Sequence, residues 1–212
     1  MGLFISFEGP DGSGKTTQIR LLTDYLTQQG HQVRHTREPG GTSIGDQIRH
    51  ILHDVGNTEM DPVAEVLLYS ASRAQLVAQV IQPALDAGEM VLSDRFADST
   101  YAYQGYGRGL DLSILRTLTD FATRSIKPDL TIYLDVPVGL GLERKHAASQ
   151  AGEGEWNRMD QLKQEFYERV RRSYLLMAEA EPDRWLVVDA GRSIETIQTA
   201  IRAAVAEKIS TR

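Results

Sequence analysis

The sequence of 212 residues predicts an α/β fold, in which a five-stranded parallel sheet lies between layers of helices. Three observations support this prediction. Short, mostly apolar runs alternate with longer amphipathic stretches, as in chains whose strands are joined by helices. The short runs end in charged residues, which makes one edge of the sheet polar. No repeat or low-complexity linker interrupts the alternation, so residues 1–212 are expected to form a single domain.

The strands are expected at the short runs, which are rich in branched or aromatic side chains. In chain order the predicted strands are residues 3–8, 32–36, 90–93, 130–136 and 185–188. Sheets of this kind bind ligands at the carboxyl ends of their strands. The residues at those ends are Glu8-Gly9, Arg37-Glu38, Asp94-Arg95, Asp135 and Asp189.

The helices are expected in the amphipathic stretches between the strands. Their predicted ranges are 15–29, 43–54, 63–87, 112–124, about 138–147, 161–180 and 194–209. The segment 147–157 has two glycines and no apolar periodicity, and basic residues flank it on both sides. We expect a mobile lid over about residues 144–160; the alternative is an ordinary solvated loop.

The composition excludes several classes of function. The formal net charge is -6 and no basic run is longer than two residues, so the broad basic face of a nucleic-acid-binding protein is not expected. The absence of cysteine excludes a disulfide framework and a thiolate metal site. No apolar run is long enough to span a membrane, so we expect a cytoplasmic protein with no membrane partner.

Residues 9–16 match the phosphate-binding pattern G-x-x-x-x-G-K-[ST], the P-loop, between a predicted strand and a predicted helix. The glycines allow a turn whose backbone N–H groups point at phosphate oxygens, beside the positive end of a helix dipole. Lys15 would reach the β- and γ-phosphates of ATP, and the Thr16 hydroxyl would ligate Mg²⁺. The residues expected to bind ATP here are Gly9, Pro10, Asp11, Gly12, Ser13, Gly14, Lys15, Thr16 and Thr17.

Another predicted strand ends in Asp94-Arg95. Alone, such a pair is most often a helix cap or a surface ion pair. Beside a P-loop, Asp94 is expected to hold Mg²⁺ through water and Arg95 to pair with phosphate. No N-K-x-D motif for guanine occurs, and the chain is short for a motor or AAA-type ATPase. The pattern therefore indicates phosphoryl transfer between small molecules.

Segments along nearly the whole chain resemble the bacterial thymidylate kinases. Each segment alone is modest support for this resemblance, whereas the whole set in this order is highly specific for the family. They are F-E-G-P-D-G-S-G-K-T-T at 7–17, T-R-E-P-G-G-T at 36–42, Y-S-A-S-R-A-Q at 69–75, D-R-F-A-D-S-T-Y-A-Y-Q-G-Y-G-R-G at 94–109, P-D-L-T-I-Y-L-D-V at 128–136 and N-R-M-D at 157–160. The resemblance implies a three-layer P-loop NTPase fold, transfer of the γ-phosphate of ATP to dTMP with Mg²⁺, and a homodimer.

The resemblance also implies how dTMP binds, partly through a region of about residues 37–75. Tyr69 and Arg73 are four residues apart and share a helix face; by resemblance the ring stacks on thymine and the guanidinium donates to a base carbonyl. Without the resemblance, a core tyrosine and a solvated arginine would be the simpler interpretation. Thr100 and Gln104 are expected to bind the remaining base edge.

By the same resemblance, Tyr103 lies under the sugar and leaves no room for a 2′-hydroxyl. The carboxylate of Asp11 accepts from the sugar 3′-hydroxyl, and Arg95 holds the 5′-phosphate. Glu38 and Arg49 are expected to be further members of the dTMP pocket.

On the ATP side, Arg144 resembles an arginine that stacks on adenine, and the loop 190–192 is expected to close over the same base. Gly12 stands where some members of the family carry a second cation in the P-loop. The lid must then supply that cation. Arg158, in the segment N-R-M-D, is expected to do so, with Arg144 and Lys145 as the alternatives.

Catalysis is expected to be direct in-line transfer, in which Lys15, Arg95 and the lid arginine hold the negative charge that spreads over the γ-phosphate. No general base is needed, because the acceptor is already an anion. One alternative is a P-loop kinase with another small acceptor, against which the base-binding set argues. The other is a binding module that uses ATP as a switch and would release no ADP when an acceptor is added.

Overall fold

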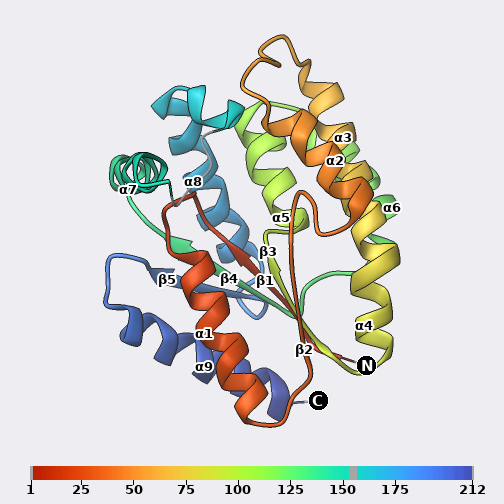
Figure 1. Ribbon diagram of the computed structural model, residues 1–212, viewed down its shortest axis with the longest axis vertical. Coiled ribbons are helices and arrows are strands. Elements are labelled where there is room, and N and C mark those ends of the chain that lie inside the picture. Colours follow the sequence, from red (N-terminus) through yellow and green to blue (C-terminus); the bar gives the residue numbers. More distant parts are fainter. Residues whose placement is uncertain (1, 153–156, 212) are drawn as a thin grey trace.

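The computed structural model describes residues 2–152 and 157–211. Within them lies a parallel sheet of five strands in the order β2-β3-β1-β4-β5 (Figure 1). Its strands are β1 (Phe4–Glu8), β2 (Val33–Arg37), β3 (Met90–Asp94), β4 (Leu130–Asp135) and β5 (Trp185–Asp189). Each strand begins and ends within one residue of the bounds that the sequence predicts, so the predicted α/β class is confirmed.

β1 lies at the centre of the sheet. Its Phe7 is opposite Asp94 in β3 and Ile132 in β4, so the carboxyl ends of these strands meet at one edge. β2 and β3 lie on one side of β1, whereas β4 and β5 lie on the other. Open parallel sheets bind ligands where the strand order reverses in this way. The topology therefore places a site beyond the end of β1.

Helices α1 (Lys15–Gln28) and α9 (Ile194–Ser210) lie side by side over one face of the sheet (Figure 1). Ile5 and Phe7 of β1 belong to the same buried cluster as residues of these two helices, whereas Phe4 packs with helices of the opposite face. Successive side chains of a strand point to opposite faces, so a strand covered on both sides must be apolar almost throughout.

The helix predicted over residues 63–87 is continuous but not uniform. It consists of α3 (Pro62–Leu76), a π-helical turn η1 (Val77–Ile81) and α4 (Gln82–Asp86). The second half packs on the opposite face of the sheet, against Phe4 of β1. The neighbouring helices α2 (Ser43–His53) and α6 (Leu112–Thr123) both contact α3.

Helix α8 (Gln164–Ala180) completes the cover of this face. It packs on Tyr133 of β4 and Trp185 of β5. The sequence predicts its start at residue 161, but residues Arg158–Gln161 form a separate 3-10 turn, η3. Asn157 caps this turn by accepting from the backbone N–H of Met159, and the chain then leaves the turn in an extended conformation.

A helical segment between β3 and α6 is missed by the sequence prediction. It comprises α5 (Ala97–Thr100) and the π-helical η2 (Tyr101–Gly107). The helix α7 (Val138–Gln150) is longer than predicted, so the first residues of the segment 147–157, which was predicted to be a loop, are helical. Residues 153–156 of that segment lie outside the described part of the chain. Of the helices described here, none combines the length and apolarity that crossing a membrane requires.

Candidate active site

A cavity of about 750 Å³ opens at the carboxyl edge of the sheet, beyond β1 and β3. The loop after β1 and helices α3, η2, α7 and α8 all contribute to its lining. The predicted site residues that line it are Pro10, Asp11, Gly12, Gly14, Lys15, Thr16, Thr17, Glu38, Arg49, Tyr69, Arg73, Asp94, Arg95, Thr100, Tyr103, Gln104 and Arg144. The predicted residues that are not part of the lining are Gly9, Ser13 and Arg158.

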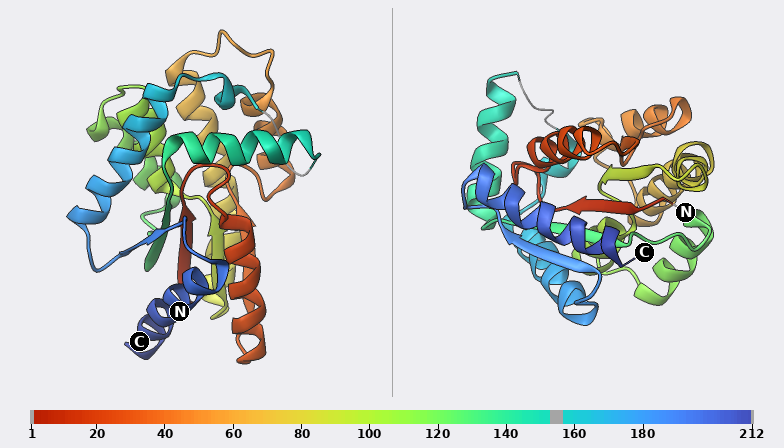
Figure 2. Two further views of the ribbon diagram at one scale, coloured as in Figure 1. Left: turned by 90° about the vertical axis from the view of Figure 1, so that its left-hand side faces the viewer. Right: turned by 90° about the horizontal axis from the view of Figure 1, so that it is seen from below.

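The loop between β1 and α1 has the shape of a phosphate cradle. Gly12 and Gly14 have φ angles of 80° and 92°, a region that favours glycine. A Cβ on Gly12 would lie 2.7 Å from the carbonyl oxygen of Gly141 in α7, which crosses above the loop (Figure 2). The residue that precedes α1 is Gly14, which has no side chain with which to cap the first turn. The N–H groups of this turn, at the positive end of the helix dipole, suit a nucleotide phosphate.

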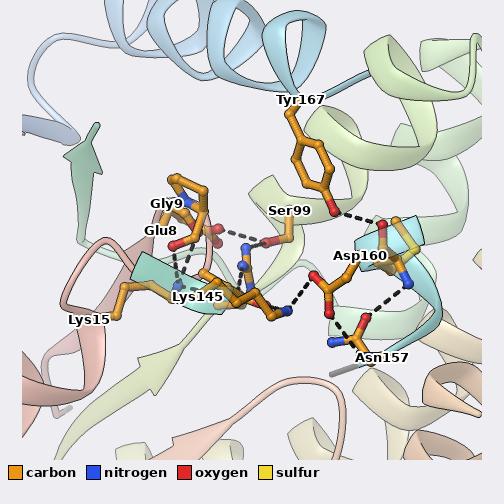
Figure 3. Close-up of polar contacts among 12 residues, drawn as sticks. Glu8, Gly9, Lys15, Ser99, Lys145, Asn157, Asp160 and Tyr167 are labelled. Atoms are coloured by element: carbon orange, nitrogen blue, oxygen red, sulfur yellow. Dashed lines mark hydrogen bonds and ion pairs between the residues drawn. The ribbon is translucent and has the colours of Figure 1, made fainter. Parts of the chain in front are cut away.

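Lys15 is the buried cation of this loop. Its Nζ donates to the carbonyl oxygens of Gly9 and Pro10, at 3.0 Å each (Figure 3). Burial lowers the pKa of Lys15, and the neighbouring positive charge of Arg95 lowers it further. A phosphate oxygen is a stronger acceptor than a carbonyl oxygen, so the ammonium is well placed to bind a nucleotide.

Asp11 lies between cations that come from distant parts of the chain. Its carboxylate accepts from Arg95 Nη2 at 2.9 Å, forms an ion pair with Lys145 and lies 3.8 Å from Lys15 Nζ. Burial alone would raise the pKa of Asp11, but Arg95, Lys15 and Lys145 hold it well below its ordinary value. The residue is therefore an ionised acceptor at the centre of the cavity.

Arg95 adopts a conformation that is rare for a residue with a side chain. Its φ is 71°, directly after β3, and its backbone N–H donates to the carbonyl oxygen of Phe7 at 2.9 Å. The guanidinium lies 5.2 Å from the centre of the Tyr103 ring. Burial raises the pKa of that phenol to about 12. Strained backbone of this kind is concentrated at functional sites, and here it directs a cation into the cavity.

Behind Arg95, a fully buried carboxyl group supports the wall of the site. Glu8 accepts from Ser99 Oγ at 2.6 Å, from Tyr174 OH at 2.7 Å and from the backbone N–H of Phe96 at 2.9 Å (Figure 3). Burial raises the pKa of Glu8 to about 7 even though Arg95 lies nearby and lowers it.

Arg73 is buried, with an exposure of 1%, which excludes the simpler interpretation of a solvated arginine. Its Nε donates to Glu38 at 2.8 Å, and its Nη1 donates to Thr100 Oγ1 at 2.8 Å. Burial raises the pKa of Glu38, although Arg73 opposes this shift. Tyr69, one turn earlier on α3, lines the same cavity, and burial raises its pKa. The structure thus brings this predicted set together.

Of the two lid cations Lys145 and Arg158, Lys145 forms an ion pair with the P-loop and Arg158 does not. Lys145 Nζ forms an ion pair with Asp11 and lies 2.6 Å from Asp160 of η3 (Figure 3). Tyr167 of α8 donates to the carbonyl oxygen of Met159 at 2.7 Å and so fixes the same turn. The sequence suggested Lys145 only as an alternative, because Arg158 belongs to the segment N-R-M-D that carries the family resemblance.

Arg158 is buried away from the cavity. Its Nη2 lies 2.5 Å from Glu65 of α3, and its Nε donates to the carbonyl oxygen of Leu52 at 3.1 Å. Arg144 lines the cavity. Its Nη1 donates to the carbonyl oxygen of Ala190 at 3.2 Å, which joins α7 to the loop after β5. That loop is the one expected beside adenine.

Thr16 and Asp94, the two predicted Mg²⁺ ligands, line the same cavity. The described residues contain no cluster of three or more His, Cys, Asp and Glu side chains that could enclose a metal. A hydroxyl and a carboxylate beside a phosphate cradle suit Mg²⁺, which binds oxygen ligands and usually keeps several waters.

Comparison with known proteins agrees with this geometry. The family model described as thymidylate kinase matches residues 7–201. The thymidylate kinase of Roseiflexus sp. (strain RS-1) is 51% identical, with 97% of this chain and 94% of the relative covered. That of Deinococcus radiodurans is 49% identical, with 98% of each covered.

A solved structure supports the same relationship. The thymidylate kinase from Ehrlichia chaffeensis has a TM-score of 0.76 and 33% sequence identity, over 96% of this chain and 98% of that one. Its match extends the sequence relationship to the whole arrangement of sheet and helices. The chain therefore belongs to the thymidylate kinase family.

Proposed function

We propose that this enzyme transfers the γ-phosphate of ATP to dTMP, producing ADP and dTDP for the synthesis of dTTP. The observation that carries the proposal is that the phosphate cradle and the buried Arg73–Thr100 pair line one cavity. Asp11 and Arg95 line the same cavity, and Arg95 donates a hydrogen bond to Asp11. Such a cavity suits two nucleotides whose phosphates meet at Arg95.

The donor nucleotide would occupy the P-loop. The N–H groups at the start of α1 would bind its phosphates, and Lys15 would exchange its two carbonyl partners for phosphate oxygens. Arg144 and the loop that begins at Ala190 would lie beside adenine, since they already contact each other. Thr16 and Asp94 would hold Mg²⁺, which supplies charge neutralisation at the β- and γ-phosphates when bound.

The acceptor would bind between α3 and η2. Tyr69 would stack on thymine, while Arg73, Thr100 and Gln104 would bind its polar edge. Tyr103 would lie under the sugar, where a 2′-hydroxyl finds no room. Asp11 would accept from the 3′-hydroxyl and Arg95 would hold the 5′-phosphate, with Glu38 and Arg49 completing the pocket over about residues 37–75.

Transfer would then be direct. The acceptor phosphate is already anionic, so the chain has only to align two phosphates and neutralise the charge that develops between them. Lys15 and Arg95 would do so from the P-loop and β3. The geometry supports Lys145 as the lid cation, whereas Arg158 could take that role only after leaving Glu65. The lid over about residues 144–160 would exclude water.

We further propose a cytoplasmic homodimer that forms through α2, α3 and α6. α3 lies between α2 and α6 and contacts both (Figure 1). All three helices carry large apolar side chains on the surface. The exposed residues are Ile44 and Ile51 of α2, Val63 and Leu67 of α3, and Ile114 and Phe121 of α6. Phe121 is 87% exposed, and a second copy would remove this apolar surface from water.

The reaction is tested by following the label from γ-³²P ATP. With dTMP present, the label should appear in dTDP, and no labelled protein should accumulate, because transfer is direct. Labelled protein would contradict the in-line mechanism. ATP binding without any acceptor-dependent ADP release would instead favour a nucleotide-dependent binding module.

A further inference from the structure

Glu65 is a buried carboxylate that does not line the cavity but holds groups that do. Its exposure is 0%, although it lies in the first turns of α3. Gln104 Nε2 donates to its Oε1 at 2.9 Å, and Arg158 Nη2 donates to its Oε2 at 2.5 Å. Arg108 donates to both oxygens, at 3.3 and 2.9 Å. One carboxylate therefore joins α3, the segment of η2 and Arg108, and the turn η3 of the lid.

The charge of Glu65 decides how the amide of Gln104 is oriented. Burial alone would raise the pKa of Glu65, but hydrogen bonds from Arg108, Gln104 and Arg158 bring it below its ordinary value. An ionised carboxylate only accepts hydrogen bonds. The NH₂ end of Gln104 must therefore face Glu65, so its carbonyl Oε1 is the polar atom left for the cavity.

Arg73 and Thr100, the two other side chains proposed to bind the polar edge of the base, present donors instead. Arg73 carries only donors, and Thr100 Oγ1 accepts from Arg73 Nη1, so the hydroxyl hydrogen of Thr100 remains to be donated. Arg73, Thr100 and Gln104 thus offer the base two donors and, from Gln104, one acceptor. Thymine matches this set with two carbonyl oxygens and an N3–H. Cytosine does not, because its N3 is an acceptor and its exocyclic amine is a donor.

We propose that Glu65 is a positioning residue for substrate choice: by accepting from Gln104, it turns the amide carbonyl toward the base and selects pyrimidines that carry an N3–H. The inference rests on the proposed function, since it takes dTMP as the acceptor. Residues four apart on a helix share a face, so Glu65 lies on the same side of α3 as Tyr69 and Arg73. One helix face then provides the stacking ring, a donor and the group that orients the acceptor.

The variant Glu65→Gln tests this assignment. Arg108 Nη2 and Arg158 Nη2 donate to the position of Oε2 at 2.9 and 2.5 Å, whereas Arg108 Nε lies farther from Oε1, at 3.3 Å, so the oxygen of the new amide stays at the position of Oε2. Its NH₂ group then faces Gln104, and because two NH₂ groups cannot bond to each other, Gln104 must turn over. The ratio of kcat/KM for dTMP to that for dCMP should fall about tenfold or more. The ratio of dTMP to dUMP should not change, since both bases carry an N3–H.

Arg108→Gln is the matched control, because it removes one partner of Glu65 and keeps the carboxylate. It should lower the unfolding temperature and leave the dTMP-to-dCMP ratio at the parent value. If Glu65→Gln keeps the dTMP-to-dCMP ratio of the parent enzyme, the assignment is overturned. A parent enzyme that phosphorylates none of these nucleotides would refute the proposed function itself.

Glu65→Gln leaves two arginines without their ionised partner and can fail to fold. The parent protein then provides the test through the ¹⁵N resonance of the Gln104 side-chain amide. Its N–H protons should exchange slowly with water, and magnetisation transfer should connect them to Glu65 both with and without dTMP. Contacts from those protons to the bound base would show that the NH₂ end faces thymine and would overturn the inference.

Discussion

Arg73 holds the base pocket together through Glu38 and Thr100, and it is also the residue proposed to bind a base carbonyl. Replacing it by alanine would leave Glu38 and a base carbonyl without their donors. A buried hydrogen-bonding group without a partner costs about 1–3 kcal/mol, so dTMP affinity should fall about tenfold or more. ATP affinity should stay nearly constant. Isothermal titration of both nucleotides checks this, with the exposed Arg20→Ala as control. Equal weakening of both would show that Arg73 has only a structural role.

Glu8 should make folding stability depend on pH. Its pKa is about 7 in the folded protein and near 4.5 in the unfolded chain, so the folded state holds a proton that the unfolded chain releases. This stability is present in full below pH 4.5 and is lost as the pH rises through 7. The shift corresponds to a loss on the order of 3 kcal/mol.

Glu8→Gln removes this titration and should flatten the dependence. Urea unfolding at intervals between about pH 5 and 8 measures it, since the midpoint follows the free energy of unfolding. Asp24→Asn, on the exposed side of α1, should behave as the parent. If the urea midpoint of Glu8→Gln changes with pH as steeply as that of the parent, groups other than Glu8 cause the pH dependence.

The residues that the sequence identified and those that it missed differ in a physical way. Lys15, Asp11 and Arg95 belong to short motifs, so local order alone places them at the edge of the sheet. Glu65 has no such signal, because an acidic residue near the start of a helix is usually a solvated charge that favours the helix dipole. Its burial depends on Arg158, which lies 93 residues further along the chain.

At the scale of elements, the strands were predictable because they are buried on both faces, and their apolar runs end where the polar edge begins. The segment 97–107 was missed because its glycines and polar residues favour a turn when taken locally. Its π-helical part packs against α8, and this tertiary contact outweighs local preference. The same packing brings Phe166 of α8 against Tyr103, which lines the cavity.

The lid contains two candidate catalytic cations, Lys145 and Arg158, and their alanine variants should differ in kcat. Lys145 contacts Asp11 in the P-loop, whereas Arg158 is paired with Glu65. A cation that acts only on the transferred phosphate can contribute about 10³-fold or more to the rate. Lys145→Ala should therefore lower kcat by about that factor with little change in dTMP or ATP binding.

Arg158→Ala is the comparison for this experiment. It should lower the unfolding temperature, because Glu65 loses one of its arginine partners, and should change kcat much less than Lys145→Ala does. Stopped-flow or coupled assays at saturating substrates give both values of kcat. The reverse order would show that Arg158 leaves Glu65 during the reaction and acts as the lid cation, the role that the sequence analysis predicts for it.

At the scale of the whole molecule, the exposed apolar side chains on α2, α3 and α6 predict self-association. Leu67→Glu together with Phe121→Glu would place two charges in a contact between copies, where they lack partners. Light scattering should then change from a dimer for the parent to a monomer for the variant. Val187→Glu, an exposed apolar position of β5, should leave the dimer intact. A parent that is monomeric at micromolar concentration would contradict the proposed dimer.

Phosphoryl transfer to a panel of nucleoside monophosphates, followed by ADP release, tests the proposed reaction most directly. dTMP should be the best acceptor. dUMP lacks one methyl group, worth about 1–3 kcal/mol, so it should be poor but measurable. UMP should be much worse still, because Tyr103 opposes its 2′-hydroxyl, and AMP and GMP should release no ADP above background. Turnover of AMP, GMP or CMP equal to that of dTMP would contradict the assignment.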